Sequence, residues 1–311
     1  KTLFYWNACI RFDPYEANDE FNANEVDWAM HRKDTGEVVK FRDRLRYYNL
    51  AVPAMREWWV KTALGMLDQQ AIDGVFIDAI MQINLAGYTI GKQVARAPEK
   101  EKGYWLMAED LRRRMPKDKL LIGNALRIAF TENGNIKHLD YLDGSYLENW
   151  SFHAGRNKTA EDHARAIAGS IEVMQKALKM GRIIMLTSGP MGALEDGKFL
   201  GGQKVGHKDQ ASKLAAMHKD ITFPLAVFLT IVEPYAYFSY HSGVDANPAK
   251  KEIWDNNVFD VLKRPLGKPL GPFKRDGYVF TRKFTKLEVM VNVMTKEAKI
   301  TWYDFPKEKR R

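Results

Sequence analysis

The stretch DGVFIDAIMQ, residues 73–82, reads as a buried strand that ends in a carboxylate, Asp78. A short apolar run bounded by turn residues is typical of a parallel strand covered on both faces. A carboxylate there is costly unless a cleft solvates it or a partner pairs with it, and the carboxyl end of a parallel strand offers such a cleft. Asp78 is therefore either a functional residue or a structural one that caps the turn or pairs with Lys or Arg, whereas Asp73 has the position of a structural turn residue.

Similar apolar runs recur along the chain and alternate with helical patterns. The predicted strands cover residues 3–7, 74–80, 120–126, 144–150, 182–188 and 235–241. Helices are predicted over 53–70 and over 159–180, where Thr159 and Asp162 have the spacing of a capping box. This alternation predicts an α/β fold in which helices cover a parallel sheet.

Two α/β architectures fit this order, an open nucleotide-binding sheet and a closed (β/α)8 TIM barrel. The open sheet calls for a glycine-rich turn after its first strand, but the segment NACIRFD, residues 7–13, has no glycine. Polar residues instead end nearly every predicted strand, as barrel active sites require: Asn7, Asp78, Asn124, Glu148, Ser188 and His241. We therefore predict a (β/α)8 barrel, and because only six barrel strands are recognisable, we expect two βα units to precede Lys1.

A change of pattern divides the chain near residue 262. Residues 263–277, KRPLGKPLGPFKRDG, form a connection rich in proline and glycine. The segments YVFTRKF, LEVMVNVM and AKITWY follow it and alternate apolar and polar residues with period two. We predict a catalytic barrel domain over 1–262 and a linker with a small antiparallel sheet, packed on the barrel, over 263–311.

Net charge and composition indicate which classes of partner and environment suit the protein. The formal net charge of +9 favours an anionic partner, either nucleic acid or an acidic or sulfated polymer, although surplus Lys and Arg that keep the surface soluble explain it equally well. The longest apolar run, 223–238, is broken by Glu233 and Pro234, so no membrane span is predicted. The single cysteine, Cys9, excludes an internal disulfide.

Glu148 repeats the pattern of Asp78 two strands later, where it shares a strand face with Tyr146. Carboxylates on alternate strands of a barrel can face each other across its mouth. Hydrolysis of a glycosidic bond needs such a pair, one to protonate the leaving oxygen and one to attack or stabilise the anomeric carbon. The alternative for Glu148 is a salt bridge to Arg127 or Arg156.

Other chemistries lack their motifs: the chain has no phosphate-binding loop, no HxH or HExxH pair and no GxSxG elbow, so we predict neither cofactor nor metal. Sugar rings stack on aromatic side chains and bond to polar ones. Trp6 and Trp150 are the favoured stacking residues, while other aromatic residues near strand ends, among them Tyr5 and Tyr235, suit core packing as well. The predicted substrate-binding residues are Trp6, Asn7, Gln82, Asn124, Arg127, Trp150, His153, Ser188, Tyr237 and His241.

Several short motifs, in a fixed order over nearly the whole chain, carry a family resemblance. They are REWWVKTA, DGVFIDA, LLIGNALR, GSYLENW and a tail with DITFPLAVFL, YFSY and RPLGKPLGP. This order resembles a bacterial glycoside hydrolase family with a TIM-barrel fold, similar in plan to fucanase-like enzymes that cut sulfated algal polysaccharides. In related barrels an Asp at the fourth strand and a Glu or Asp at the sixth act as nucleophile and acid/base. If two strands precede Lys1, the resemblance therefore implies that Asp78 is the nucleophile and Glu148 the acid/base of a retaining enzyme.

The sequence thus predicts a glycoside hydrolase that cleaves a polysaccharide, which the basic charge favours as anionic or sulfated. This substrate class would imply a secreted or periplasmic protein. The alternative from another class is a catalytically inactive barrel that binds carbohydrate with the same residues. A nucleic-acid binder has only the net charge in its support, with no recognised motif.

Overall fold

The computed structural model describes residues 1–13, 15–32, 34–80, 97–127, 133–148, 150, 159–190, 194–195, 198–199, 209–242 and 252–303. The chain divides into two compact units. The first unit comprises Lys1–Ala125 and Ile136–Tyr146, and the second comprises Leu126–Asn135 and Leu147–Arg311.

Parallel strands dominate the first unit, in the order β1-β4-β5-β6. They are β1 (Leu3–Asn7), β4 (Gly74–Asp78), β5 (Leu120–Gly123) and β6 (Gly144–Leu147), whose last residue is grouped with the second unit. The other elements are α1 (Asn18–Ala23), α2 (Glu25–Trp28), the hairpin β2 (Lys40–Phe41) and β3 (Leu45–Arg46), α3 (Pro53–Leu67), α5 (Ala97–Arg114) and the 3₁₀ helix η2 (Ile136–Asp140). Each of the first two strand pairs is thus connected through a helix.

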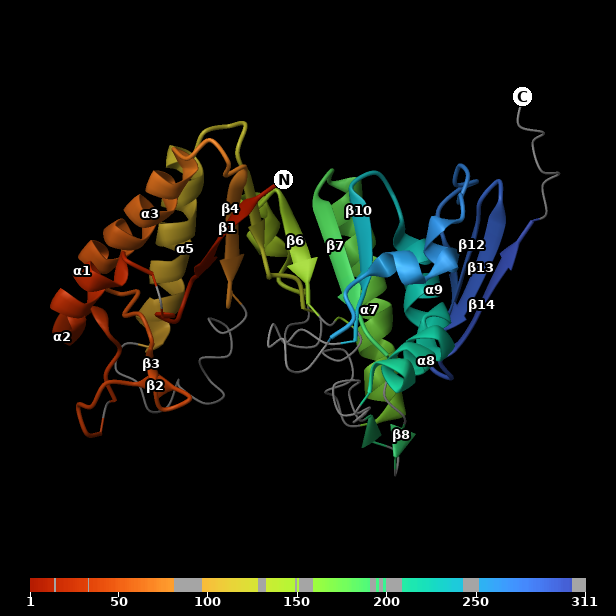
Figure 1. The fold of residues 1–311 in the computed structure, drawn as a ribbon, viewed down its shortest axis with the longest axis horizontal. Coiled ribbons are helices and arrows are strands. Elements are labelled where there is room, and N and C mark those ends of the chain that lie inside the picture. The colour runs from red at the N-terminus through yellow and green to blue at the C-terminus, as the bar shows by residue number, and fades with distance from the viewer. Residues whose placement is uncertain are drawn as a thin grey trace. The chain divides into compact units, whose positions relative to one another are not determined.

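Helices α3 and α5 cover one face of this sheet (Figure 1). On that face Trp6 packs against Trp58 and Trp59, with ring centroids 5.7 and 6.1 Å away. The indole nitrogen of Trp59 donates to the carbonyl oxygen of Asn7 at 2.8 Å, which fixes the helix to the end of β1. On the other face Tyr5 stacks on Phe76, so side chains alternate between the hydrophobic core and a more accessible side.

The second unit contains the parallel pair β7 (Ile183–Ser188) and β10 (Ala236–Tyr240). Its helices are α7 (Ala160–Lys179), α8 (Gln210–Asp220), α9 (Thr222–Ile231) and the short η5 (Asn256–Val258) and η6 (Asp260–Lys263). The hairpin β8 (Leu194–Glu195) and β9 (Lys198–Phe199) lies between β7 and α8 in the sequence.

A four-stranded antiparallel sheet ends the second unit and packs against α9 (Figure 1). Its strands are β11 (Lys274–Asp276), β12 (Val279–Lys283), β13 (Leu287–Asn292) and β14 (Glu297–Trp302). The buried guanidinium of Arg282 donates to the carbonyl oxygens of Thr230 and Val232 and pairs with Glu233 at 2.7 Å. One cation therefore satisfies the open end of α9 and holds the sheet on it.

The α/β class and the small antiparallel sheet near the C-terminus are confirmed, and each of the six predicted barrel strands contains an observed parallel strand. The predicted cap of the helix after residue 159 is also confirmed, because the hydroxyl of Thr159 accepts from the backbone N–H of Asp162. The domain boundary at residue 262 stays a prediction.

Within the described residues, no single helix is long and apolar enough to cross a membrane. Helices α8 and α9 together reach the required length and composition, but the pair is bent by 46°.

Candidate active site

Asp78 lies at the carboxyl end of β4, half-buried, and two neutral groups hold its carboxylate. The phenol of Tyr5 donates to Oδ2 at 2.6 Å, and the amide nitrogen of Asn124 donates to Oδ1 at 3.1 Å. Among the described residues, no Lys or Arg pairs with it. The carboxylate is therefore fixed in orientation by donors that do not neutralise its charge.

The strand register explains why these side chains meet. Asn7 of β1 lies opposite Asp78 of β4, and Tyr5 two residues earlier points to the same face of the sheet. Asn124 directly follows β5, whose Gly123 pairs with Ile77. Three neighbouring strands thus deliver a phenol, a carboxylate and a carboxamide to one edge, the edge where barrel enzymes carry their active sites.

Asn7 stabilises the turn after β1, next to Tyr5 and Asp78. Its side-chain oxygen accepts from the backbone N–H groups of Cys9 and Ile10, at 2.9 and 2.8 Å. Its amide nitrogen approaches the Tyr5 hydroxyl at 3.5 Å, the limit of a hydrogen bond. Because Asn7 is 3% exposed, its place is structural as well as adjacent to the site.

The backbone next to Asp78 is strained. Ala79 has φ 63°, in the left-handed region that residues with a Cβ disfavour. The N–H of Ala8 donates to the carbonyl oxygen of Asp78 at 2.9 Å and continues the β1–β4 pairing to that point. The chain therefore leaves the sheet directly after the carboxylate, and such strain is a feature of functional sites.

Two residues near Asp78, Tyr5 and Cys9, have raised pKa values, so both side chains are uncharged at neutral pH. Burial, followed by the negative charge of Asp78 and the hydrogen bond to it, raises the pKa of the Tyr5 phenol well above its usual value. Burial likewise raises the pKa of the Cys9 thiol, which lies within 3.6 Å of the carbonyl oxygen of Ala79. Tyr5 therefore remains a hydrogen-bond donor to Asp78 throughout the neutral range.

The two predicted stacking residues, Trp6 and Trp150, are packed into the protein. Trp6 is 1% exposed, lies on the helix-facing side of β1 and donates from its indole nitrogen to the carbonyl oxygen of Trp59. Trp150 is 3% exposed. Neither ring offers a face to a sugar, and Tyr5 is instead the aromatic residue beside Asp78. Strand position explains why Tyr5 and not Trp6 lies beside Asp78, because Tyr5 shares its strand face with Asn7 whereas Trp6 points to the opposite face.

The remaining predicted residues that the structure describes belong to the second unit. Ser188 and His241 meet at the carboxyl ends of β7 and β10, where the N–H of His241 donates to the carbonyl oxygen of Ser188 at 3.0 Å. Tyr237 is exposed near the amino end of β10, and Arg127 is buried. Glu148 follows β6 and is half-buried. Its pairing with Asp78 stays a prediction. Gln82 and His153 lie outside the described residues.

Comparison with known protein families assigns the chain. Residues 1–288 match the family described as hypothetical glycosyl hydrolase family 15. The chain belongs to this family. No curated protein matches the sequence.

Solved structures similar to this family member include three glycosidase-related proteins. An α-amylase from Geobacillus thermoleovorans complexed with acarbose has 12% identity, with 93% of this chain and 64% of that chain covered, at a TM-score of 0.45. The Nostoc punctiforme debranching enzyme has 14% identity, with 93% and 64% covered, at 0.45. An α-galactosidase from Geobacillus stearothermophilus complexed with 1-deoxygalactonojirimycin has 10% identity, with 92% and 35% covered, at 0.44. The chain therefore spans less than two thirds of the length of each.

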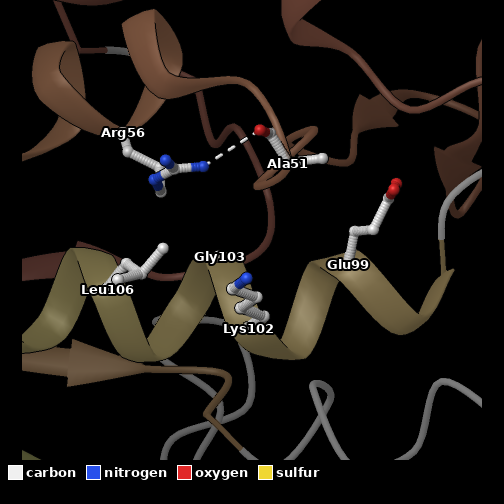
Figure 2. Close-up of a pocket in the computed structure, with 6 residues that line it drawn as sticks. All are labelled: Ala51, Arg56, Glu99, Lys102, Gly103 and Leu106. Atoms are coloured by element: carbon white, nitrogen blue, oxygen red, sulfur yellow. Dashed lines mark hydrogen bonds between the residues drawn. The ribbon is translucent and has the colours of Figure 1, made fainter.

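A separate pocket of about 260 Å³ lies in the first unit of this family member, on the helix side (Figure 2). It is lined by Ala51, Arg56, Glu99, Lys102, Gly103 and Leu106. The guanidinium of Arg56 donates to the carbonyl oxygens of Leu50 and Ala51 at 2.7 and 3.0 Å, and burial lowers its pKa. Because its lining includes a single carboxylate, this pocket lacks the acid pair that glycoside hydrolysis needs. Within the described ranges, no three His, Cys, Asp or Glu side chains are grouped to hold a metal ion.

Proposed function

We propose that the protein is a glycoside hydrolase that cleaves a polysaccharide with Asp78 as its nucleophile. Family membership supports the reaction class. The single observation that carries the assignment is the Asp78 carboxylate, held at the end of β4 by Tyr5 and Asn124 without a cationic partner in the described part of the chain. A carboxylate that keeps its negative charge can stabilise and attack a positive anomeric carbon, whereas an ion-paired one is neutralised.

The proposed reaction is retaining and proceeds in two steps. In the first, an oxygen of Asp78 bonds to the anomeric carbon while the glycosidic C–O bond breaks, and the proton of Glu148 goes to the leaving oxygen. In the second, the Glu148 carboxylate takes a proton from water, whose oxygen displaces Asp78 from the anomeric carbon. Tyr5 and Asn124 hold the carboxylate oriented throughout, so little reorganisation is needed at the moment of attack.

The substrate is proposed to be an anionic or sulfated polysaccharide. The formal charge of +9 supports this class because it attracts polyanions. Screening by salt weakens such attraction in the ground state. KM for the anionic substrate should therefore rise with ionic strength more than kcat changes, and a KM that is independent of salt would make neutral glycans the better assignment.

Product analysis after incubation with neutral and sulfated polysaccharides tests the proposal. Release of oligosaccharides by the wild type and its loss in Asp78→Asn support hydrolysis, whereas binding without cleavage supports the inactive carbohydrate-binding alternative. Proton NMR of freshly formed product reports the anomeric configuration. With Glu148→Ala, added azide should yield a glycosyl azide of retained configuration, and an inverted product would refute the two-step reaction.

A further inference from the structure

Trp254 places an exposed indole beside the carboxyl end of β10. Its ring stacks on the imidazole of His241, with centroids 4.7 Å apart and planes 19° from parallel. His241 is fully buried, whereas Trp254 is 48% exposed. Because the imidazole covers one face of the indole, the accessible part of the side chain is the opposite face and its edge. A flat apolar ring is thus presented to solvent on a buried base.

Hydrogen bonds on both sides of Trp254 fix its backbone to the strand. Ser242, just beyond β10, donates its N–H to the carbonyl oxygen of Ile253 at 3.1 Å, and its hydroxyl accepts from the N–H of Ile253 at 2.8 Å. The side chain of Asn256 accepts from the N–H of Tyr240 at 2.8 Å and donates to the carbonyl oxygen of Trp254 at 3.2 Å. The indole is therefore preorganised, and a ligand that stacks on it loses little entropy to ordering the protein.

Glu252 adds a further attachment. Its carboxylate accepts from the hydroxyl of Ser242 and forms an ion pair with Lys213 of α8 at 3.2 Å. These groups are largely buried, so the pair has more weight than a surface salt bridge. The segment that carries Trp254 is thus connected to both β10 and α8, although the indole itself gains no burial from this.

The other end of β10 provides a contrast. Tyr235 precedes the strand, at its amino end, and is 58% exposed, so it is not packed in the core. Ligands of (β/α) proteins bind at the carboxyl ends of the strands. Trp254 lies at that end, and Tyr235 does not.

We propose that Trp254, supported by His241, forms a sugar-stacking subsite for the polysaccharide substrate. This inference rests on the proposed function, because the ligand is a sugar ring whose apolar C–H face packs on the indole. The stacked ring gives affinity that is the same in the ground state and the transition state. It therefore lowers KM and leaves kcat nearly unchanged.

The test uses affinity electrophoresis in gels that contain starch, laminarin or fucoidan, together with kinetics on the polysaccharide that retards the wild type most. Trp254→Ala should raise both the dissociation constant and KM about tenfold, since it removes one aromatic stacking partner. Trp254→Phe should recover most of this loss because it keeps a ring. Tyr235→Ala is the matched control, an exposed aromatic at the wrong end of the strand, and should bind as the wild type does.

The outcomes separate the subsite from the reaction. If Trp254→Ala and Tyr235→Ala both bind as the wild type does while the wild type hydrolyses the glycan, the subsite is refuted and the proposed function stands. If Trp254→Ala loses affinity but Asp78→Asn still hydrolyses, the subsite stands and the proposed nucleophile is refuted. If none of the three gels retards the wild type, the subsite is refuted as well.

Discussion

The two ends of β4 carry two aspartates in opposite electrostatic settings. At the amino end, the carboxylate of Asp73 accepts from the ammonium of Lys1 at 2.8 Å and from the N–H of Thr2 at 2.7 Å. At the carboxyl end, Asp78 accepts from the neutral side chains of Tyr5 and Asn124. The same residue type, five positions apart, is thus paired with a cation at one end and held only by neutral donors at the other.

This difference supports a structural role for Asp73 and the proposed reactive role of Asp78. The hydrogen bond from Lys1, followed by that from the backbone of Thr2, holds the pKa of Asp73 below its usual value. A carboxyl group with a lowered pKa stabilises the folded state above its unfolded pKa, and this contribution is lost as pH falls through the folded pKa. Asp73 therefore serves folding, whereas Asp78 has no such partner in the described residues and remains available for chemistry.

The largest expected effect is that of Asp78→Asn on turnover. The amide keeps the shape and removes the nucleophile, so kcat on the hydrolysed polysaccharide should fall by roughly three orders of magnitude or more. Asp73→Asn is the matched control at the other end of the strand and should keep kcat near that of the wild type. Steady-state kinetics measure both.

A thermal melt of each variant completes this test. Asp78→Asn should melt within a few degrees of the wild type, since the amide oxygen still accepts from Tyr5 or Asn124. The reverse pattern, an active Asp78→Asn or an inactive but folded Asp73→Asn, would mean that the two ends of β4 have been assigned the wrong way round.

The second effect concerns stability in acid, because acid unfolding must be distinguished from a loss of activity caused by the carboxylates. His138, in η2, is 2% exposed, stacks on Trp105 with centroids 4.6 Å apart and approaches the Tyr141 hydroxyl at 2.7 Å through Nδ1. Burial lowers its pKa from 6.5 to about 4. Between pH 6.5 and 4, His138 is therefore protonated in the unfolded chain and neutral in the folded chain. The free energy of unfolding falls by about 3 kcal/mol as pH drops through this window.

Denaturant titrations at pH 7, 5 and 4 measure this loss. His138→Gln keeps a hydrogen-bonding side chain and removes the titration, so its stability should start lower and depend less on pH across this window. Equal pH dependence in both proteins would contradict the role of His138. Loss of activity in acid should be attributed to the proposed pair, Asp78 and Glu148, only where the wild type is still folded.

Sequence patterns located the strand that carries Asp78 because apolar runs and their polar ends are local features. They also placed Asn124 near it, since consecutive parallel strands bring their ends to one edge. They failed between Tyr5 and Trp6, because adjacent aromatic residues both suit a strand, and the face that meets α3 is set by Trp58 and Trp59. The sequence pattern gave no signal for Trp254, because it lies outside the helices and strands and is positioned by hydrogen bonds between its neighbours and the end of β10.

The third effect is that of Tyr5→Phe on catalysis at the carboxyl end. This change removes one of the two donors to Asp78 and keeps the ring stacked on Phe76. A hydrogen bond to a charged group contributes about 1.5 to 3 kcal/mol, so kcat should fall roughly tenfold to a hundredfold. Tyr15→Phe is the control, because its hydroxyl donates only to the backbone oxygen of Tyr5, at 3.0 Å. Similar kcat values for both variants would show that the phenol of Tyr5 does not orient the carboxylate.

The smallest effect tests the backbone at the same end. Ala79 adopts φ 63°, whereas no residue from 71 to 78 has a positive φ, so the left-handed conformation occurs just after β4 and not within it or before it. Glycine occupies this region without steric conflict, and Ala79→Gly should therefore raise the free energy of unfolding, by about 1 kcal/mol. Ala215→Gly, at an exposed position within α8, is the control of opposite sign and should lower it by a similar amount. Equilibrium denaturation measures both changes. A loss of stability in Ala79→Gly would mean that the Cβ contributes more by packing than its conformation costs, and the end of β4 would then be no more strained than its beginning.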